Sequence, residues 1–265
     1  MRVFLSLNSN KTSVKFYSCG ISSFQIKNIT NKNLIRLFFI FCTLVFAQGA
    51  DHLLLTRIVT QPDIAESFSI YNPTNSAIDL SNYYVCDDEE YYKMQTEGVM
   101  VPSSSANGFT AQFPNISIIP GDTFHIVLNE NYSEFYGEDF VPDLIMYGSN
   151  ANSMLETETE PFSSFGGADD KINDTAEMLI LFNWDGDFSN PIKDVDYFLW
   201  GNNQNAIDKS DVPGYQSDTS ADDQLFFEEI AENYYAYSRI GTDEVDEPQT
   251  GGNGITGHDE TSENF

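Results

Sequence analysis

Basic residues are scarce in most of this 265-residue chain. Lysine and arginine together number 12, against 41 aspartates and glutamates, and the formal net charge is −29. Residues 1–50 hold six basic residues and no acid, so residues 51–265 combine the other six with all 41 acids, a net charge of −35. Such a surface repels nucleic-acid phosphates and anionic membrane surfaces, which excludes nucleic acid as a partner. It favours cations, whether calcium, a basic partner or a saline medium.

Cysteine and histidine are also rare. Cys19 and Cys42 lie in the N-terminal segment that we predict to be a cleaved leader. Cys86 is then the one cysteine of the mature chain, with no partner for an intramolecular disulfide or a cysteine-based metal site. We expect Cys86 to be a buried thiol, with a disulfide between chains as the alternative. The three histidines form no HxH or HExxH pattern, and no GxSxG or Walker motif occurs. We therefore predict no zinc hydrolase and identify no catalytic residue.

The apolar run near the N-terminus is short for a membrane span. Residues 37–47 form an eleven-residue run, whereas a spanning helix needs about 20 apolar residues. Lys32 and Arg36 precede the run and small residues follow it, an order typical of a secretory signal peptide. We predict a signal peptide over residues 1–47 and secretion, with no membrane span after cleavage. A signal anchor is the alternative.

After residue 52 the pattern is short, alternating and rich in β-formers. It predicts strands at residues 53–60, 66–71, 77–80, 83–86, 124–128, 178–182, 195–200 and 234–240. Turn sequences separate them, and residues 183–187 are expected to form a simple type I′ hairpin. Helices are expected only at 132–136 and 222–232.

This pattern predicts an all-β fold, an immunoglobulin-like antiparallel β-sandwich with long acidic loops at 87–113 and 149–171. We place the sandwich domain at residues 48–240. An acidic, glycine-rich C-terminal tail follows at residues 241–265.

The order of several segments resembles that of a known family. Residues 66–74, Glu-Ser-Phe-Ser-Ile-Tyr-Asn-Pro-Thr, are followed by residues 78–85, Ile-Asp-Leu-Ser-Asn-Tyr-Tyr-Val. Residues 119–124 carry a Pro-Gly turn into a strand, and residues 195–197 read Val-Asp-Tyr. This order is similar to that of a lamin-tail domain over roughly residues 52–240.

The resemblance to lamin-tail domains implies an immunoglobulin-like sandwich of the secreted type, which serves as an adhesion or accessory module without catalysis. The long acidic loops depart from the family pattern. No coiled-coil rod precedes the domain, so the filament function of nuclear lamins does not carry over. The family's nucleic-acid contacts do not carry over either, because of the net charge of −35.

Two acidic loops supply candidate metal ligands. Calcium takes about six to eight oxygen ligands from loops of this kind. No EF-hand frame fits at Asn183, because Phe188 stands where glycine is required. The candidate ligands are Asp87, Asp88, Glu89, Glu90, Asp185 and Asp187, and the cofactor they would hold is calcium. The alternatives are a solvated acidic loop and a plain hairpin. No spacing rule ranks Asp169, Asp170, Asp194, Asp196, Asp222 or Asp223.

Taken together, these features predict a secreted, non-enzymatic interaction or adhesion module of the lamin-tail type, stabilised by calcium. Pairs of tyrosines at 83–84, 91–92 and 234–235 can present a surface to a protein or glycan partner. The alternative functions are a secreted calcium-dependent hydrolase and an accessory carbohydrate-binding module.

Overall fold

The computed structural model describes residues 2–8, 11–17, 50–98, 108–147, 152–156, 172–210, 212–215 and 219–242. The chain divides into two compact units, Met1–Ala47 and Gln48–Phe265. In the first unit, strands β1 (Arg2–Asn8) and β2 (Lys11–Tyr17) form an antiparallel pair. The predicted apolar run at 37–47 and the predicted tail beyond Thr242 lie outside the described residues.

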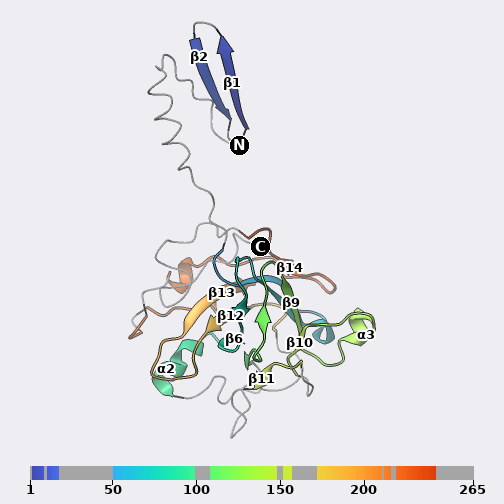
Figure 1. The fold of residues 1–265 in the computed structure, drawn as a ribbon. Helices are drawn as coiled ribbons and strands as arrows, with labels where there is room; N and C mark the ends of the chain where they lie inside the picture. Colours follow the sequence, from blue (N-terminus) through green and yellow to red (C-terminus); the bar gives the residue numbers. More distant parts are fainter. Residues whose placement is uncertain are drawn as a thin grey trace. The chain divides into compact units, whose positions relative to one another are not determined.

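The regular secondary structure of the second unit consists mainly of strands (Figure 1). These are β3 (Leu54–Val59), β4 (Ser67–Tyr71), β5 (Ile78–Asp79), β6 (Tyr83–Cys86), β7 (Thr110–Gln112), β8 (Ser117–Ile118), β9 (Thr123–Val127), β10 (Leu144–Ile145), β11 (Leu155–Glu156), β12 (Glu177–Asn183), β13 (Lys193–Trp200) and β14 (Tyr237–Ser238). The helical segments are η1 (Asp63–Ala65), η2 (Tyr91–Lys93), α2 (Met94–Glu97), α3 (Ser133–Tyr136) and η3 (Ala221–Asp223). The strand-rich pattern and the helix expected at 132–136 are confirmed.

Two five-stranded sheets form a sandwich. The first sheet has the order β10-β9-β4-β3-β14 and the second the order β11-β7-β6-β12-β13, while β5 and β8 form a separate pair. All of these pairs are antiparallel except β10 with β9. The predicted all-β sandwich is therefore confirmed, with one parallel pair in it.

The space between the two sheets holds the main core. Both sheets contribute alternate residues to one cluster of buried side chains, among them Phe68 and Ile126 from the first sheet and Leu179 and Trp200 from the second. Burying apolar side chains of this size gains about 1.5–3 kcal/mol each. The alternation of serine with apolar residues in β4 and the apolar run in β12 explain why these two strands could be predicted from sequence.

The second sheet has a further core on its outer face. Met178, Ile180 and Phe182 of β12 point away from the first sheet and pack with η2 and with the chain around residue 207. Cys86 belongs to this cluster and is a fully buried free thiol, as predicted. Because both faces of β12 are covered, five consecutive residues of the strand are buried.

A β-bulge divides β13 into two registers. Asp196 pairs with Leu181, but Asp194 pairs with the next residue, Phe182, so Val195 is an extra residue. A one-residue shift reverses the face on which the following side chains lie. Asp194 therefore lies with the outer core, whereas Asp196 lies with the inner one.

Two local predictions were wrong. The connection between β12 and β13 spans residues 184–192 rather than a two-residue turn, because Trp184 stays buried and the Asp185 and Asp187 side chains each accept an N–H two residues further on. Of residues 222–232, which were expected to form a helix, only 222 and 223 are helical, as part of η3. Gln224 is held instead by hydrogen bonds to the Ile207 and Thr219 carbonyls. Tertiary contacts override a weak helical periodicity.

In the described part of the chain, no helix combines the length and apolar character needed to cross a membrane.

Candidate binding groove

The C-terminal strap, residues 227–242, crosses from one sheet to the other. It begins against the end of β13, where the Phe227 N–H donates to the Leu199 carbonyl at 2.9 Å and the Gly201 N–H donates to the Phe227 carbonyl at 2.9 Å. It ends as β14, which pairs with β3 in the first sheet. The strap therefore spans one open side of the sandwich.

Gly201 makes the start of the strap feasible. Its φ is +78°, a conformation that favours glycine, and a Cβ there would lie 1.9 Å from the Thr175 carbonyl oxygen. No other residue type fits this turn without moving the backbone of residues 175–176.

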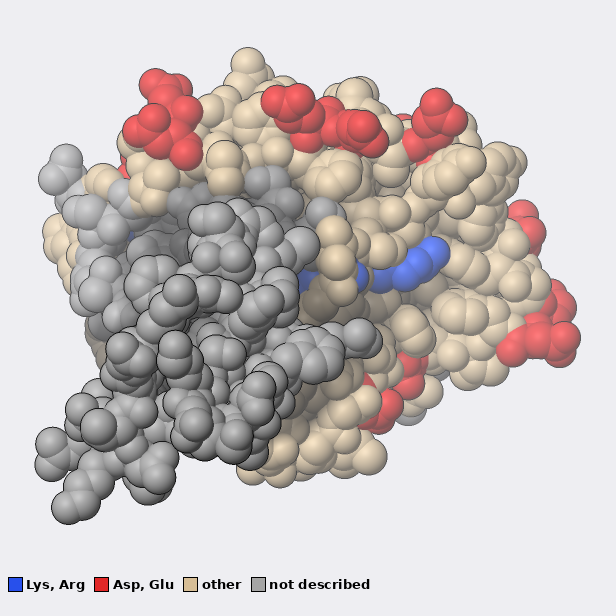
Figure 2. All heavy atoms as spheres, turned by 90° about the horizontal axis from the view of Figure 1, so that it is seen from above, with Lys and Arg blue, Asp and Glu red and all other residues tan. Residues whose placement is uncertain are grey.

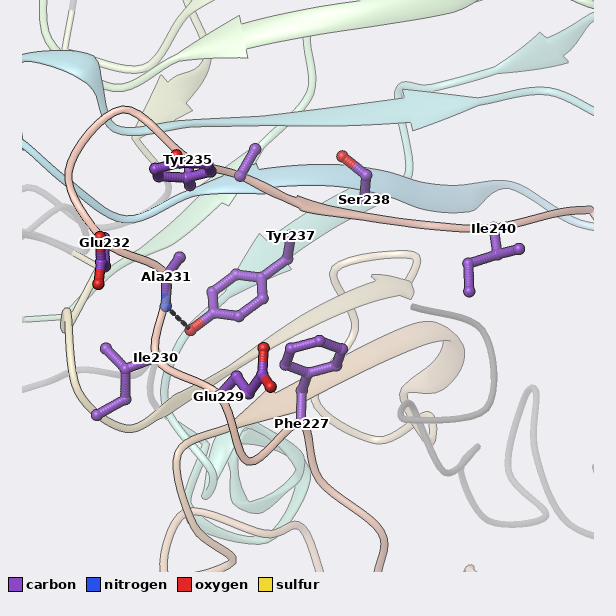
Figure 3. A pocket seen from close by; sticks show the side chains of 10 residues that line it. Phe227, Glu229, Ile230, Ala231, Glu232, Tyr235, Tyr237, Ser238 and Ile240 are labelled. Atoms are coloured by element: carbon purple, nitrogen blue, oxygen red, sulfur yellow. Dashed lines mark hydrogen bonds between the residues drawn. The ribbon is translucent and has the colours of Figure 1, made fainter.

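Tyr237 anchors the middle of the strap. Its ring lies 5.0 Å from that of Phe198 and 5.3 Å from that of Phe227, measured between centroids. Its hydroxyl accepts a hydrogen bond at 2.9 Å from the Ala231 N–H, which holds the two halves of the strap together (Figure 3). The side chain of Gln61 also donates to the Ala231 carbonyl. Aromatic packing and these hydrogen bonds fix the strap's shape.

A groove of about 510 Å³ lies between the two halves of the strap. It is lined by Phe227, Glu229, Ile230, Ala231, Glu232, Tyr235, Ala236, Tyr237, Ser238 and Ile240 (Figure 3). Several apolar side chains around it are exposed, Ile230 by 48%, Tyr235 by 66% and Ile240 by 81%. Exposed apolar groups gathered in one place, with charged groups beside them, are typical of interaction sites.

β14 is an edge strand, and one row of its backbone groups points away from the sheet. The Arg239 N–H donates to the Thr56 carbonyl at 2.9 Å, and Tyr237 lies opposite Ile58. In an antiparallel pair the residues between such bonded pairs turn their N–H and C=O groups outward. Ala236 and Ser238 therefore direct backbone groups away from β3, and both residues are among those that line the groove.

The groove is also acidic. Glu229 and Glu232 are exposed and line it, and no lysine or arginine is among the lining residues. Figure 2 shows one face of the molecule, with Asp and Glu side chains spread around its rim and few Lys or Arg side chains. A ligand with both a positive charge and apolar groups would complement this surface.

The predicted metal ligands at residues 87–90 do not converge. Asp87 is buried, and its carboxylate accepts the Phe109 N–H at 2.6 Å. Asp88 accepts the Glu90 N–H at 2.8 Å, and Glu90 pairs with Lys93. Glu89 is exposed. Asp87, Asp88 and Glu90 therefore stabilise the turn after β6 and the entry to η2.

Asp185 and Asp187 lie at the opposite end of the second sheet. β6 and β12 are antiparallel, with Cys86 opposite Ile180 and Tyr83 opposite Asn183. The loop after Cys86 thus lies beside the start of β12, whereas Asp185 and Asp187 follow its end. The described ranges contain no group of three or more His, Cys, Asp or Glu residues that could hold a metal ion.

Asp87 instead lies close to another acid, Glu177 at the start of β12. Burial, with a further contribution from the Glu177 charge, raises the pKa of Asp87 well above its ordinary value, against the hydrogen bond from Phe109. Burial likewise raises the pKa of Glu177 to about 7, although the Met178 N–H and the Asn205 amide hydrogen-bond to its carboxylate. This part of the molecule therefore contains carboxyl groups that gain protons more readily than usual.

Among the unranked acids, Asp194 and Asp196 each pair with a base. Asp194 pairs with Lys209, and Asp196 lies 3.4 Å from the Arg239 guanidinium. Asp169 and Asp170 lie outside the described residues, and Asp222 and Asp223 fall in η3.

The strap groove was not predicted from the sequence. The signal available was the tyrosine pair at 234–235, but its neighbours in the fold are set by strand pairing that no local pattern encodes.

Comparison with known proteins does not assign this chain to a family. No protein-family model matches the chain, and no curated protein matches it. One solved structure, a DUF4876 family protein from Bacteroides thetaiotaomicron VPI-5482, is similar at a TM-score of 0.35 and 10% identity, covering 76% of this chain. The chain spans 64% of the length of that protein.

Proposed function

We propose that this protein is an exported, non-enzymatic interaction module that binds an extended, positively charged segment of a partner protein along the outer edge of β14. The observation that supports this most is the juxtaposition of the strap groove with the outward backbone groups of Ala236 and Ser238. Edge strands that lie beside side-chain pockets bind extended peptides by adding a strand to the sheet.

The side chains of the groove suit such a peptide. Tyr235 and Ile240 offer apolar contacts, while Glu229 and Glu232 would pair with lysine or arginine side chains of the partner. The predicted signal peptide and the resemblance of residues 66–85 to lamin-tail domains also favour an exported interaction module. The clustered ligands that the calcium-dependent alternatives need are not found among the described residues.

A pair of synthetic peptides tests the proposal. One alternates lysine with valine, and the other has glutamate in place of each lysine. We expect the purified protein to bind the lysine peptide at least tenfold more tightly, which corresponds to about 1.4 kcal/mol. Equal affinity for the two peptides would contradict the charge preference.

Ser238→Pro tests the role of the β14 edge. Proline removes an outward N–H without removing a bond to β3, because the N–H groups of residues 237 and 239 face β3. We expect it to abolish binding of the lysine peptide while Ser238→Ala, which keeps the N–H, binds normally. Binding that survives in Ser238→Pro would overturn strand addition. If a glycan panel bound instead and the signal were lost in Tyr235→Ala, the partner would be a carbohydrate.

A further inference from the structure

Lys209 and Asp194 form an ion pair that is shut off from solvent in the outer core. The side chain of Lys209 is 0% exposed and that of Asp194 is 2% exposed, and the lysine Nζ contacts Oδ2 of the aspartate. A fully buried lysine is rare. Removing both charges from water costs several kcal/mol per ion, which a single ion pair does not always offset.

Aromatic side chains surround this pair. The Nζ of Lys209 lies 6.0 Å from the ring centroids of Tyr91 and Tyr215. The Tyr91 hydroxyl donates to Oδ1 of Asp194, and the Lys209 Nζ contacts Oδ2. Low polarity disfavours the charged forms of both groups. Transfer of one proton from the ammonium to the carboxylate would convert the pair into an amine beside a carboxylic acid.

We propose that Lys209 and Asp194 become joined by an intramolecular isopeptide bond. The neutral Nζ attacks Cγ of the protonated Asp194 and forms the new C–N bond. The C–Oδ2 bond breaks, and the departing hydroxyl takes a proton from Nζ and leaves as one water molecule. Oδ1 remains as the amide oxygen. The reaction is a dehydration and needs no oxidant or further reactant.

Tyr91 lies where it can assist this reaction. Negative charge develops on Oδ1 as nitrogen adds to Cγ, and a hydrogen-bond donor already placed on that oxygen stabilises it. The Tyr91 oxygen also lies 3.5 Å from Nζ, so the same hydroxyl touches both reacting side chains. The inference is independent of the proposed binding function, since the pair lies in the outer core and not in the strap groove.

A second lysine–carboxylate pair in the chain, which is exposed to water, serves as a control for the effect of burial. Lys93 and Glu90 also contact one another, but their side chains are 34% and 54% exposed. Water stabilises the charges of this pair and keeps the amine protonated. We therefore expect an isopeptide bond at Lys209 and none at Lys93.

Digestion of the fully denatured protein with trypsin, followed by mass spectrometry, tests the proposal. Trypsin cleaves after Lys193 and, if the lysine is unmodified, after Lys209. We expect no cleavage after Lys209, and a peptide running from Asp194 to Arg239 that is lighter than its sequence by one water. Fragmentation should place the link between the two side chains. Cleavage after Lys93 should be normal.

Complete cleavage after Lys209 with an unmodified peptide beginning at Asp194 would overturn the proposal. A succinimide at Asp194 also loses water, but it leaves Lys209 open to trypsin, and that result would overturn it as well. Tyr91→Phe is expected to slow formation of the link at least tenfold in freshly synthesised protein. Formation at the normal rate in that variant would overturn the role of Tyr91.

Discussion

Two carboxylates on β13, only two residues apart, are buried in different ways. Asp194 lies in the outer core beside Lys209, and Asp196 lies in the inner core beside Arg239. Asp196 also accepts the Leu55 N–H at 2.6 Å, so it joins the second sheet to β3 of the first. The bulge at Val195 is what separates them, because without it both side chains would lie on one face.

The two bases differ in what they can do. A guanidinium stays charged in a protein and serves only as a cation and hydrogen-bond donor, whereas a buried lysine can become a neutral nucleophile. The inner pair therefore remains a salt bridge that ties the sheets together, and the outer pair has the components of an amide. Burial removes both ion pairs from water, and the chemistry of the basic side chain decides whether the pair stays a salt bridge or can form an amide.

The largest effect is expected from Arg239→Ala. It leaves the Asp196 carboxylate buried without the guanidinium, and breaking a buried pair in this way costs about 3–5 kcal/mol of unfolding free energy. Urea unfolding measures the loss. Arg239→Ala combined with Asp196→Asn should recover much of it, because the amide oxygen still accepts the Leu55 N–H. A loss below about 1 kcal/mol would contradict a structural role for this pair.

Lys209→Arg makes the outer pair resemble the inner one. It keeps a positive charge beside Asp194 but removes the nucleophile, so no isopeptide bond can form. A link between residues 15 apart in sequence stabilises by about 3 kcal/mol in the chain-entropy model. We expect thermal unfolding of the variant at a clearly lower temperature. If Lys209→Arg unfolded at the same temperature as the unchanged protein, the outer pair would be an ordinary salt bridge like the inner one.

Glu177 shows what happens to a partly buried carboxyl group that lies near other acids. Its pKa is raised from 4.5 to about 7 in the folded state, so its contribution to stability is full below pH 4.5 and is lost as the pH rises through 7. We expect a loss of about 2 kcal/mol over this range, after a discount for partial exposure. Glu177→Gln should flatten the pH profile in urea unfolding, and an equally steep profile in that variant would assign the dependence to Asp87.

The carboxylates of the two acidic loops are expected to matter least for stability. Asp88, Asp185 and Asp187 accept backbone N–H groups in turns, and the two loops lie at opposite ends of the second sheet. Adding EDTA and then excess calcium should change unfolding free energy by less than about 0.5 kcal/mol. A gain near 2.7 kcal/mol at about 100 times the dissociation constant would instead support the calcium prediction made from sequence.

Local sequence patterns predicted the strands well but not their partners. The alternation in residues 67–71 indicates a strand with one apolar face, and the apolar run at 178–182 indicates a strand that is covered on both faces. The bulge at Val195 could not be predicted, because a bulge is defined by how the residues of β13 pair with those of β12, and the sequence does not show that pairing. For the same reason, sequence alone gave no means of ranking Asp194 and Asp196 among 41 acids.

The candidate site was predicted least well. The density of carboxylates at residues 87–90 favoured a metal site there, but the structure shows that Asp87 and Asp88 accept backbone N–H groups instead. The groove depends on two long-range pairings, of Phe227 with β13 and of Tyr237 with β3. The helix expected at 222–232 concealed the first, and the strand predicted at 234–240 did not indicate its partner. Tyr235 stands out by its exposure, which is a property of the folded surface.

The strap has a consequence for how the molecule is made. β14 pairs with β3, the first strand of the sandwich, although almost the whole domain separates them in sequence. A chain synthesised from its N-terminus must keep the edge of β3 unpaired until residues 237–238 have emerged, and such distant pairing is slow. During that interval the β3 edge is open to strands of other chains. Closure by the strap is then the step that converts an aggregation-prone nascent chain into a finished domain.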